Sequence, residues 1–171
     1  MEDDIKKHFW GALDELIHSF PVCEKVIIEG DFNGHIGMLL GGYNGVHAGF
    51  GFGDRNASGV SLLEFAKAFE LFIANSYFRK RENHLVTFKS AVARTQINFF
   101  LLRSADKGTC KDCKVIPNEV LTTQHKLLVM DLVIRGSRIR NSKKDIPRIR
   151  WWALDMDNMQ VLADKLRVSG A

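Results

Sequence analysis

The chain has 171 residues, of which 46% are hydrophobic and 26% are charged, and its formal net charge is +4. These proportions are close to those of a soluble globular domain, and they exclude a disordered, fibrous or coiled-coil chain. No apolar run approaches the roughly 18 residues of a membrane span. The acidic start also lacks the basic-then-apolar pattern of a signal peptide. We therefore expect an intracellular protein that does not associate with membranes.

The first predicted elements alternate between helix and strand. Apolar residues recur every three or four positions from Asp3 to Phe20, which indicates an amphipathic helix that Pro21 closes. The run KVIIEG, residues 25–30, is typical of a short strand that is buried on both faces. Residues 34–59 hold nine of the chain's 14 glycines, so we expect a long loop there. Long loops inside compact domains are usually functional.

The second half of the chain is dominated by strand patterns. Either Ser58 or Ser61 is expected to cap a second helix whose apolar face includes Leu62, Leu63 and Phe65. Five further strands are expected at residues 71–76, 84–90, 95–104, 113–117 and 126–134. The order of helix, strand, helix and then several strands predicts a layered α/β body with mixed sheets.

Three cysteines and a basic segment raise separate questions. An odd count of Cys23, Cys110 and Cys113 argues against a disulfide framework. Cys110 and Cys113 form one C-x-x-C pair, but a structural zinc site needs four ligands, so ordinary buried cysteines are favoured. Residues 135–150 hold seven Lys or Arg and one Asp, and this stretch is interpreted as a basic linker. It could neutralise phosphates or simply be solvated, and the two interpretations are equally supported. Residues 151–171 look like the start of a following helical segment.

Polar residues stand at three predicted strand ends. Asp31 and Asn33 follow the first strand, Asn98 opens a strongly apolar one, and His125 directly precedes the last. Turn chemistry alone would explain the GDFNG stretch, because Asp and Asn favour turns. The alternative is that these strand ends converge on one site. In an extended segment, the i, i+2 spacing of Asp31 and Asn33 would place both side chains on one face.

Three motifs in order resemble a known family. They are GDFN at 30–33, TQINFFLL at 95–102 and TTQHKLLVMDL at 122–132. These motifs resemble the later motifs of the endonuclease/exonuclease/phosphatase superfamily. The glycine-rich loop and the trailing RIRWW are similar to its craniofacial development protein 2-like and LINE-type retrotransposon endonuclease branch. The resemblance spans about residues 25–152. It implies a DNase I-like sandwich of two sheets, represented by residues 1–134 as a partial domain without the N-terminal half.

The resemblance also implies roles for individual residues. Asp31 would accept a proton from the attacking water or orient it, Asn33 would hold phosphate and water, and His125 would donate a hydrogen bond to the phosphate. Asn98 stands where the family has an Asp, so it contributes no negative charge beside His125. Gln124 likewise replaces an anionic metal ligand. Mg²⁺ prefers hard anionic oxygens, so we expect weak Mg²⁺ binding.

These features leave three functions open. The first is a divalent-metal-dependent phosphodiester hydrolase, endonuclease-like, which as a truncated domain would be weakly active or inactive. The second is a catalytically inactive module that binds nucleic acid, DNA in preference to RNA. The third is a retrotransposon-derived remnant without a biochemical role. In each case a missing sheet half would leave exposed strand edges, through which the chain could associate with itself.

Overall fold

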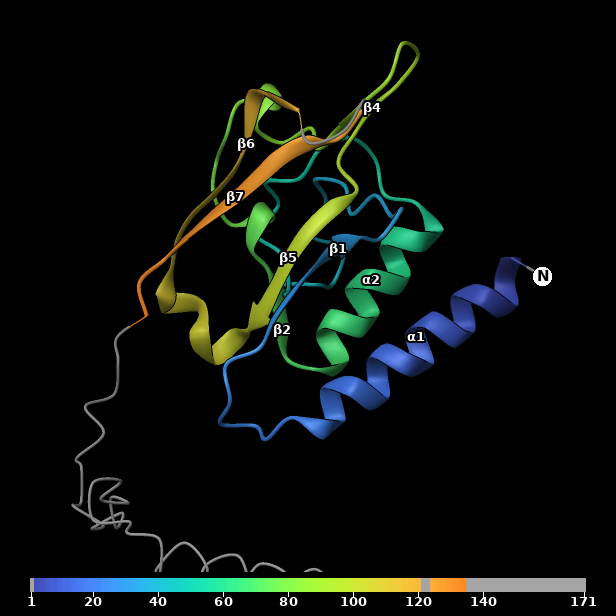
Figure 1. Cartoon of the computed structure of the whole chain (residues 1–171), viewed down its shortest axis with the longest axis vertical. Helices are drawn as coiled ribbons and strands as arrows, with labels where there is room; N and C mark the ends of the chain where they lie inside the picture. The colour runs from blue at the N-terminus through green and yellow to red at the C-terminus, as the bar shows by residue number, and fades with distance from the viewer. Residues whose placement is uncertain (1, 121–123, 135–171) are drawn as a thin grey trace, which may run out of the picture. The chain divides into compact units, whose positions relative to one another are not determined.

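The computed structural model describes residues 2–120 and 124–134, and Figure 1 shows their arrangement. The predicted basic linker at 135–150 and the predicted helical segment at 151–171 lie outside the described residues. Among the helices in the described part, none has both the length and the apolar character needed to cross a membrane.

The described chain contains two α-helices, seven strands and three short 3-10 helices. In chain order they are α1 (Glu2–Ser19), β1 (Ile27–Asp31), α2 (Ala57–Ala68), β2 (Leu71–Ile73), η1 (Ala74–Ser76), η2 (Glu82–His84), β3 (Phe88–Lys89), β4 (Arg94–Thr95), β5 (Asn98–Arg103), η3 (Ser104–Thr109), β6 (Cys110–Val120) and β7 (Lys126–Leu132). The predicted first helix and the glycine-rich loop before α2 are both confirmed.

A three-stranded sheet of order β1-β5-β2 lies between two other layers (Figure 1). Successive side chains of β5 point to opposite faces, as a strand requires. Phe99 and Leu101 join one core cluster with residues of α1 and α2, whereas Phe100 and Leu102 join another with residues of β6 and β7. The central sheet therefore packs against helices on one face and against the β6–β7 hairpin on the other. This confirms a layered α/β body.

The mixed sheets that we expected are not found among the described strands. The pairs β1–β5, β2–β5, β3–β4 and β6–β7 are all antiparallel. The strands β1 and β2 run in the same direction, but β5 lies between them and opposes both. The helix between β1 and β2 therefore connects strands that are not neighbours.

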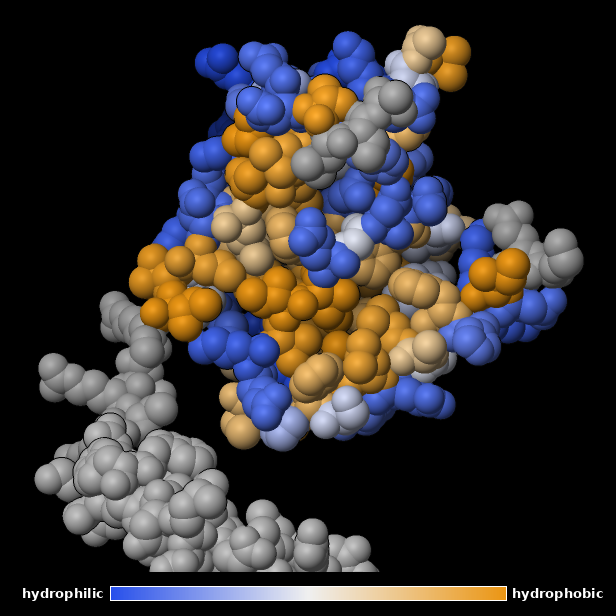
Figure 2. Space-filling view, in the orientation of Figure 1, coloured by the Kyte–Doolittle hydropathy of each residue, from blue (hydrophilic) through white to orange (hydrophobic). Residues whose placement is uncertain are grey.

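β1 is an edge strand, which corrects the expectation that it is buried on both faces. Among the described strands it pairs only with β5, and its side chains alternate between exposed and half-buried. Ile28 packs against the helix layer, whereas Ile27 on the opposite face is 46% exposed. Apolar side chains gather in the same region in Figure 2, and a small groove there is lined by Ile27, Leu102 and Leu132. An uninterrupted apolar run does not by itself show whether a second layer covers both faces of the strand.

Two predicted strands are shorter than the sequence suggested. The segment 71–76 is a strand only to Ile73 and then turns into a 3-10 helix, whereas the segment 84–90 is a strand only at Phe88 and Lys89. The cap of α2 also differs, because the N-cap is Asn56 rather than Ser58 or Ser61. The side chain of Asn56 accepts a hydrogen bond from Gly59 N at 2.8 Å.

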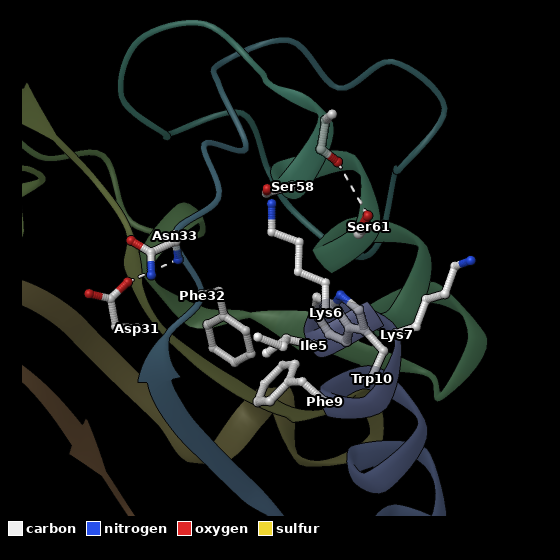
Figure 3. A pocket seen from close by; sticks show the side chains of 11 residues that line it. Ile5, Lys6, Lys7, Phe9, Trp10, Asp31, Phe32, Asn33, Ser58 and Ser61 are labelled. Carbon is white, nitrogen blue, oxygen red and sulfur yellow. Dashed lines mark hydrogen bonds between the residues drawn. The ribbon is translucent and has the colours of Figure 1, made fainter. Parts of the chain in front are cut away.

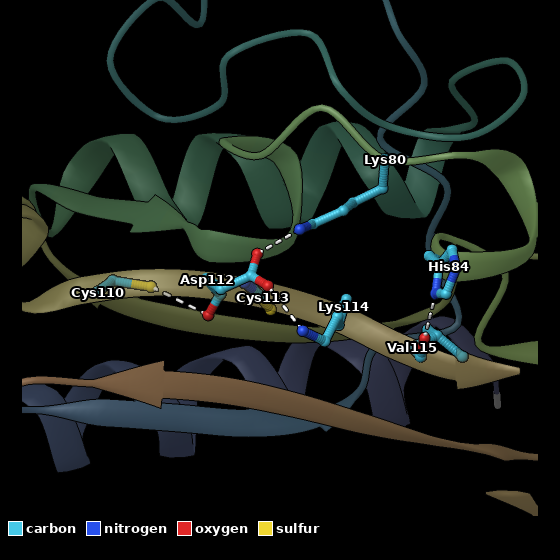
Figure 4. Close-up of polar contacts among 7 residues, drawn as sticks. All are labelled: Lys80, His84, Cys110, Asp112, Cys113, Lys114 and Val115. Atoms are coloured by element: carbon cyan, nitrogen blue, oxygen red, sulfur yellow. Dashed lines mark hydrogen bonds and ion pairs between the residues drawn. The ribbon is translucent and has the colours of Figure 1, made fainter.

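Cys110 and Cys113 are free thiols whose side chains are buried in the core between the two sheets (Figure 4). Burial raises the pKa of both thiols. Between them, Asp112 forms ion pairs with Lys80 at 2.5 Å and with Lys114 at 2.9 Å. Burial raises the pKa of Asp112, but hydrogen bonds from the two lysines outweigh that effect and leave the pKa below its usual value. These contacts attach the outer strand β6 to the segment that follows η1.

Candidate functional site

Three strand ends meet at Asp31, Asn98 and His125. Asp31 ends β1 and Asn98 begins β5, and the two residues are paired across the antiparallel ladder. His125 directly precedes β7, and its Nδ1 lies 3.3 Å from Asn98 Oδ1 and 3.8 Å from Asp31 Oδ2. The structure thus brings together the strand ends that sequence reasoning expected to converge. Their chemical roles stay predictions.

The imidazole of His125 is oriented by its neighbours. Its ring makes a T-shaped contact with the ring of Phe88, with 5.1 Å between centroids and 69° between planes. The backbone beside it is fixed by the hydrogen bond from Lys126 N to Thr87 O at 2.8 Å. Both nearby side-chain oxygens face Nδ1, so a proton on Nδ1 is favoured. Nε2 makes no hydrogen bond with the described residues, and this is the ring atom through which His125 can contact a ligand.

Asp31 changes the electrostatic picture that the sequence suggested. The substitution of an amide at Asn98 led us to expect no negative charge beside His125. In the structure the carboxylate of Asp31 occupies that neighbourhood. The side chains of His125 and Asp31 are 32% and 31% exposed, so both can reach a ligand from solvent.

Asn33 lies in a turn after β1 and not, as we predicted, in an extended segment. β1 ends at Asp31, and the backbone of Asn33 is in the left-handed region with φ of 48°. Its backbone N donates a hydrogen bond to Asp31 Oδ1 at 2.9 Å, which is the local turn that an Asp side chain favours. Strand alternation therefore does not place the two side chains on one face. They nevertheless line the same pocket (Figure 3).

Two buried residues that sequence reasoning missed hold Asn98 in place. Asn75 Nδ2 donates to Asn98 O at 3.0 Å, and Asn75 Oδ1 accepts from Phe100 N at 2.9 Å. Thr87 Oγ1 accepts from the backbone N of Ile97 at 2.9 Å and of Asn98 at 3.1 Å. The one sequence signal is that Asn75 interrupts the apolar run LFIANSYF, a pattern that also fits the end of a strand.

The described residues do not fit a resident Mg²⁺ ion. No group of three or more His, Cys, Asp or Glu that could hold a metal occurs in the part of the chain that the structure describes. Gln124, the predicted weak ligand, is exposed, and its backbone carbonyl accepts from Lys89 N at 2.9 Å. Glu29 and Asp31 are two residues apart in β1 and both occupy its exposed positions, but together they supply only two carboxylates. Mg²⁺ favours several anionic oxygens.

The glycine-rich loop is held against α2 and its own turns. Asn56 Oδ1 accepts from His35 N at 2.9 Å, and a Cβ at Gly59 would collide with the His35 carbonyl oxygen, so only glycine fits there. Arg55 Nε donates to Ile36 O at 2.9 Å. Burial lowers the pKa of His47, whose ring is 3.1 Å from Leu39 O. These bonds fix the loop that leaves the site at Asn33.

Comparison with known proteins finds relatives for most of the chain. Craniofacial development protein 2 from Tragulus javanicus is 28% identical over 123 residues, and so is the protein of the same name from Bos taurus. The chain is similar to craniofacial development protein 2. The resemblance to craniofacial development protein 2 that was named from the motifs is thereby confirmed.

The matched stretch covers 71% of this chain, but only 21% and 20% of the two craniofacial development proteins. The chain therefore spans about a fifth of the length of the curated relatives that it matches. No family model matches the chain, and no solved structure matches it.

Proposed function

We propose that this chain is an endonuclease-like phosphodiester hydrolase domain of the DNase I-like sandwich type, weakly active by itself, that acts on DNA inside the cell. The observation that supports it is the meeting of Asp31, Asn98 and His125 at three strand ends. The similarity to craniofacial development protein 2 and the GDFN motif at 30–33 support the same proposal.

In the proposed reaction a water molecule attacks the phosphorus atom and the bond to the leaving oxygen breaks. Asp31 Oδ2 accepts the proton that the water loses, while Oδ1 remains bonded to Asn33 N. The imidazolium form of His125 donates from Nε2 to a non-bridging phosphate oxygen as negative charge develops there. Asn98 fixes the ring by accepting from Nδ1. The leaving oxygen takes its proton from solvent.

Mg²⁺ is proposed as a cofactor that binds only weakly and is not held as a resident ion. The described residues supply too few carboxylates to hold it alone, so weak Mg²⁺ binding is part of the proposal.

Nicking of supercoiled plasmid by the full chain tests this function. We expect slow nicking in Mg²⁺ that is abolished in Asp31→Ala and in His125→Ala. Asp54→Ala is the matched control, because Asp54 is an exposed carboxylate of the glycine-rich loop outside the site. Nicking that survives in Asp31→Ala, or its absence even at high protein excess, refutes the proposal.

A second candidate is a nucleic-acid-binding module without catalysis. It is favoured by the lack of a three-ligand metal group among the described residues. Its binding would draw on the basic residues at 135–150, whose structure lies outside the described part. We expect affinity to fall steeply with salt and to be unchanged in Asp31→Ala. Binding that is insensitive to salt argues against this candidate.

A further inference from the structure

A pocket of about 850 Å³ opens beside the candidate site (Figure 3). It lies between the N-terminal half of α1, the end of β1 and the first two turns of α2, and Asp31 and Asn33 form part of its rim. Of the residues that line the pocket, only Asp31 and Asn33 take part in the proposed hydrolysis. The other lining residues have no role in that chemistry.

One side of the pocket is aromatic. Trp10 is stacked on Phe32, with 6.1 Å between centroids and 18° between planes. Phe9 meets Trp10 and Phe32 edge-on, at 5.1 Å and 6.4 Å. Phe9 is 46% exposed although its ring lines a pocket. An exposed aromatic ring in a concave surface offers a planar apolar contact to a ligand.

The remainder of the lining is cationic and hydroxylic. Lys6 and Lys7 come from α1, and Ser58 and Ser61 come from the first two turns of α2. The side chain of Lys6 points toward Ser58 (Figure 3). Ammonium groups and hydroxyls are groups that bind phosphate oxygens. The pocket therefore combines a surface suited to a planar apolar group with a surface suited to an anion.

We propose that this pocket binds one unpaired nucleotide of a nucleic-acid strand, with its base against Phe9 and its phosphate beside Lys6 and Lys7. Because Asp31 and Asn33 belong to the same rim, the next phosphodiester of that strand lies at the candidate site. This placement rests on the proposed function, whereas binding of the strand does not require cleavage. A base within a duplex is stacked on its neighbours, so the occupant belongs to a single strand or a locally opened one.

Fluorescence anisotropy with the full chain in EDTA tests the base contact. The probes are a short labelled poly(dT) strand and the same strand with abasic sites. Phe9→Ala should weaken binding of poly(dT) about tenfold, since stacking on an aromatic side chain contributes about that much per base, and it should leave the abasic strand unaffected. Phe20→Ala is the control, because Phe20 is also an exposed phenylalanine but does not line the pocket.

The phosphate-binding role of the lysines is tested with the double variant Lys6→Gln/Lys7→Gln. Both strands should bind more weakly, and the slope of log affinity against log salt should fall by about 0.7 for each phosphate that the variant no longer neutralises. The control Arg79→Gln/Lys111→Gln removes the same charge outside the pocket. It should lower affinity less at every salt concentration.

The pocket proposal is overturned if wild type fails to bind poly(dT), or if Phe9→Ala binds it as wild type does. It is also overturned if Phe9→Ala weakens both strands equally, because the ring would then not contact a base. Circular dichroism of each variant separates these results from unfolding. Failure of the proposed hydrolysis is seen separately in the nicking assay, so a Phe9-dependent interaction without nicking leaves the pocket assigned and the hydrolase refuted.

Discussion

Asn75 is expected to be one of the residues on which the stability of the central sheet most depends. Its side chain is almost fully buried, and it continues the pairing of β5 after β2 has ended at Ile73. Where a further strand residue would have bonded, the carboxamide accepts from Phe100 N and donates to Asn98 O. Replacing Asn75 by Ala removes the partner of the buried Phe100 N–H and of the partly buried Asn98 carbonyl.

The expected cost follows from these two groups. A buried polar group that loses its partner destabilises the fold by about 1–3 kcal/mol, so Asn75→Ala should lower the free energy of unfolding by about 3 kcal/mol. For a domain of this size that corresponds to a drop in Tm of about 10 °C. Whole domains are stable by only about 5–15 kcal/mol, so the change is a large fraction of the total.

Urea unfolding followed by circular dichroism measures the effect. Asn83→Ala is the matched control, since Asn83 is exposed and its side chain makes no hydrogen bond with the described residues. We expect the control to stay within about 0.5 kcal/mol of wild type, as exposed substitutions usually do. A cost below about 1 kcal/mol for Asn75→Ala would show that the two backbone groups are not left unpaired by the substitution. The absence of any cooperative transition in wild type would instead favour a remnant that does not fold.

Three further outcomes are expected. Asp112→Asn should cost about 0.5–1 kcal/mol at neutral pH. Because the folded pKa of Asp112 is lowered, the urea midpoints of variant and wild type should converge as the pH falls through that lowered pKa, and a gap independent of pH contradicts this. Ellman's reagent should react rapidly with Cys23 alone in the native protein, since Cys110 and Cys113 are buried, and a second fast thiol disproves it. Ile27→Lys should reduce concentration-dependent self-association in sedimentation velocity, whereas the same change at exposed Val92 should not. Equal association in both variants would argue against self-association through the edge of β1.

The sequence predicted most reliably those features that depend on local periodicity. The spacing of apolar residues located α1 to within one residue at each end, and the density of glycine located the long loop. Those two features depend on the chain's own pattern rather than on what packs beside it. The convergence of Asp31, Asn98 and His125 depends on how the strands pair, and we expected it as one of two alternatives from polar residues at three predicted strand ends and from the family resemblance.

Features that depend on neighbouring layers could not be predicted in the same way. The run at 25–30 is equally apolar whether or not a second sheet covers it, so the exposure of Ile27 had no sequence signal. Asn56 and Ser58 are both good caps, and the loop bond from His35 N to Asn56 decides between them. Asn75 has the sequence context of a strand end, although its side chain takes the place of a backbone pair.

The open edge of β1 lies beside the candidate site, because Asp31 is both the last residue of that edge and the carboxylate nearest His125. Any strand that aligned with this edge would bring one of its own side chains next to Asp31. The same pairing would then extend the sheet and bring a further functional group to the site. Reactivity in such an arrangement would depend on assembly, so the weak activity of the single chain would change once a second strand pairs with β1.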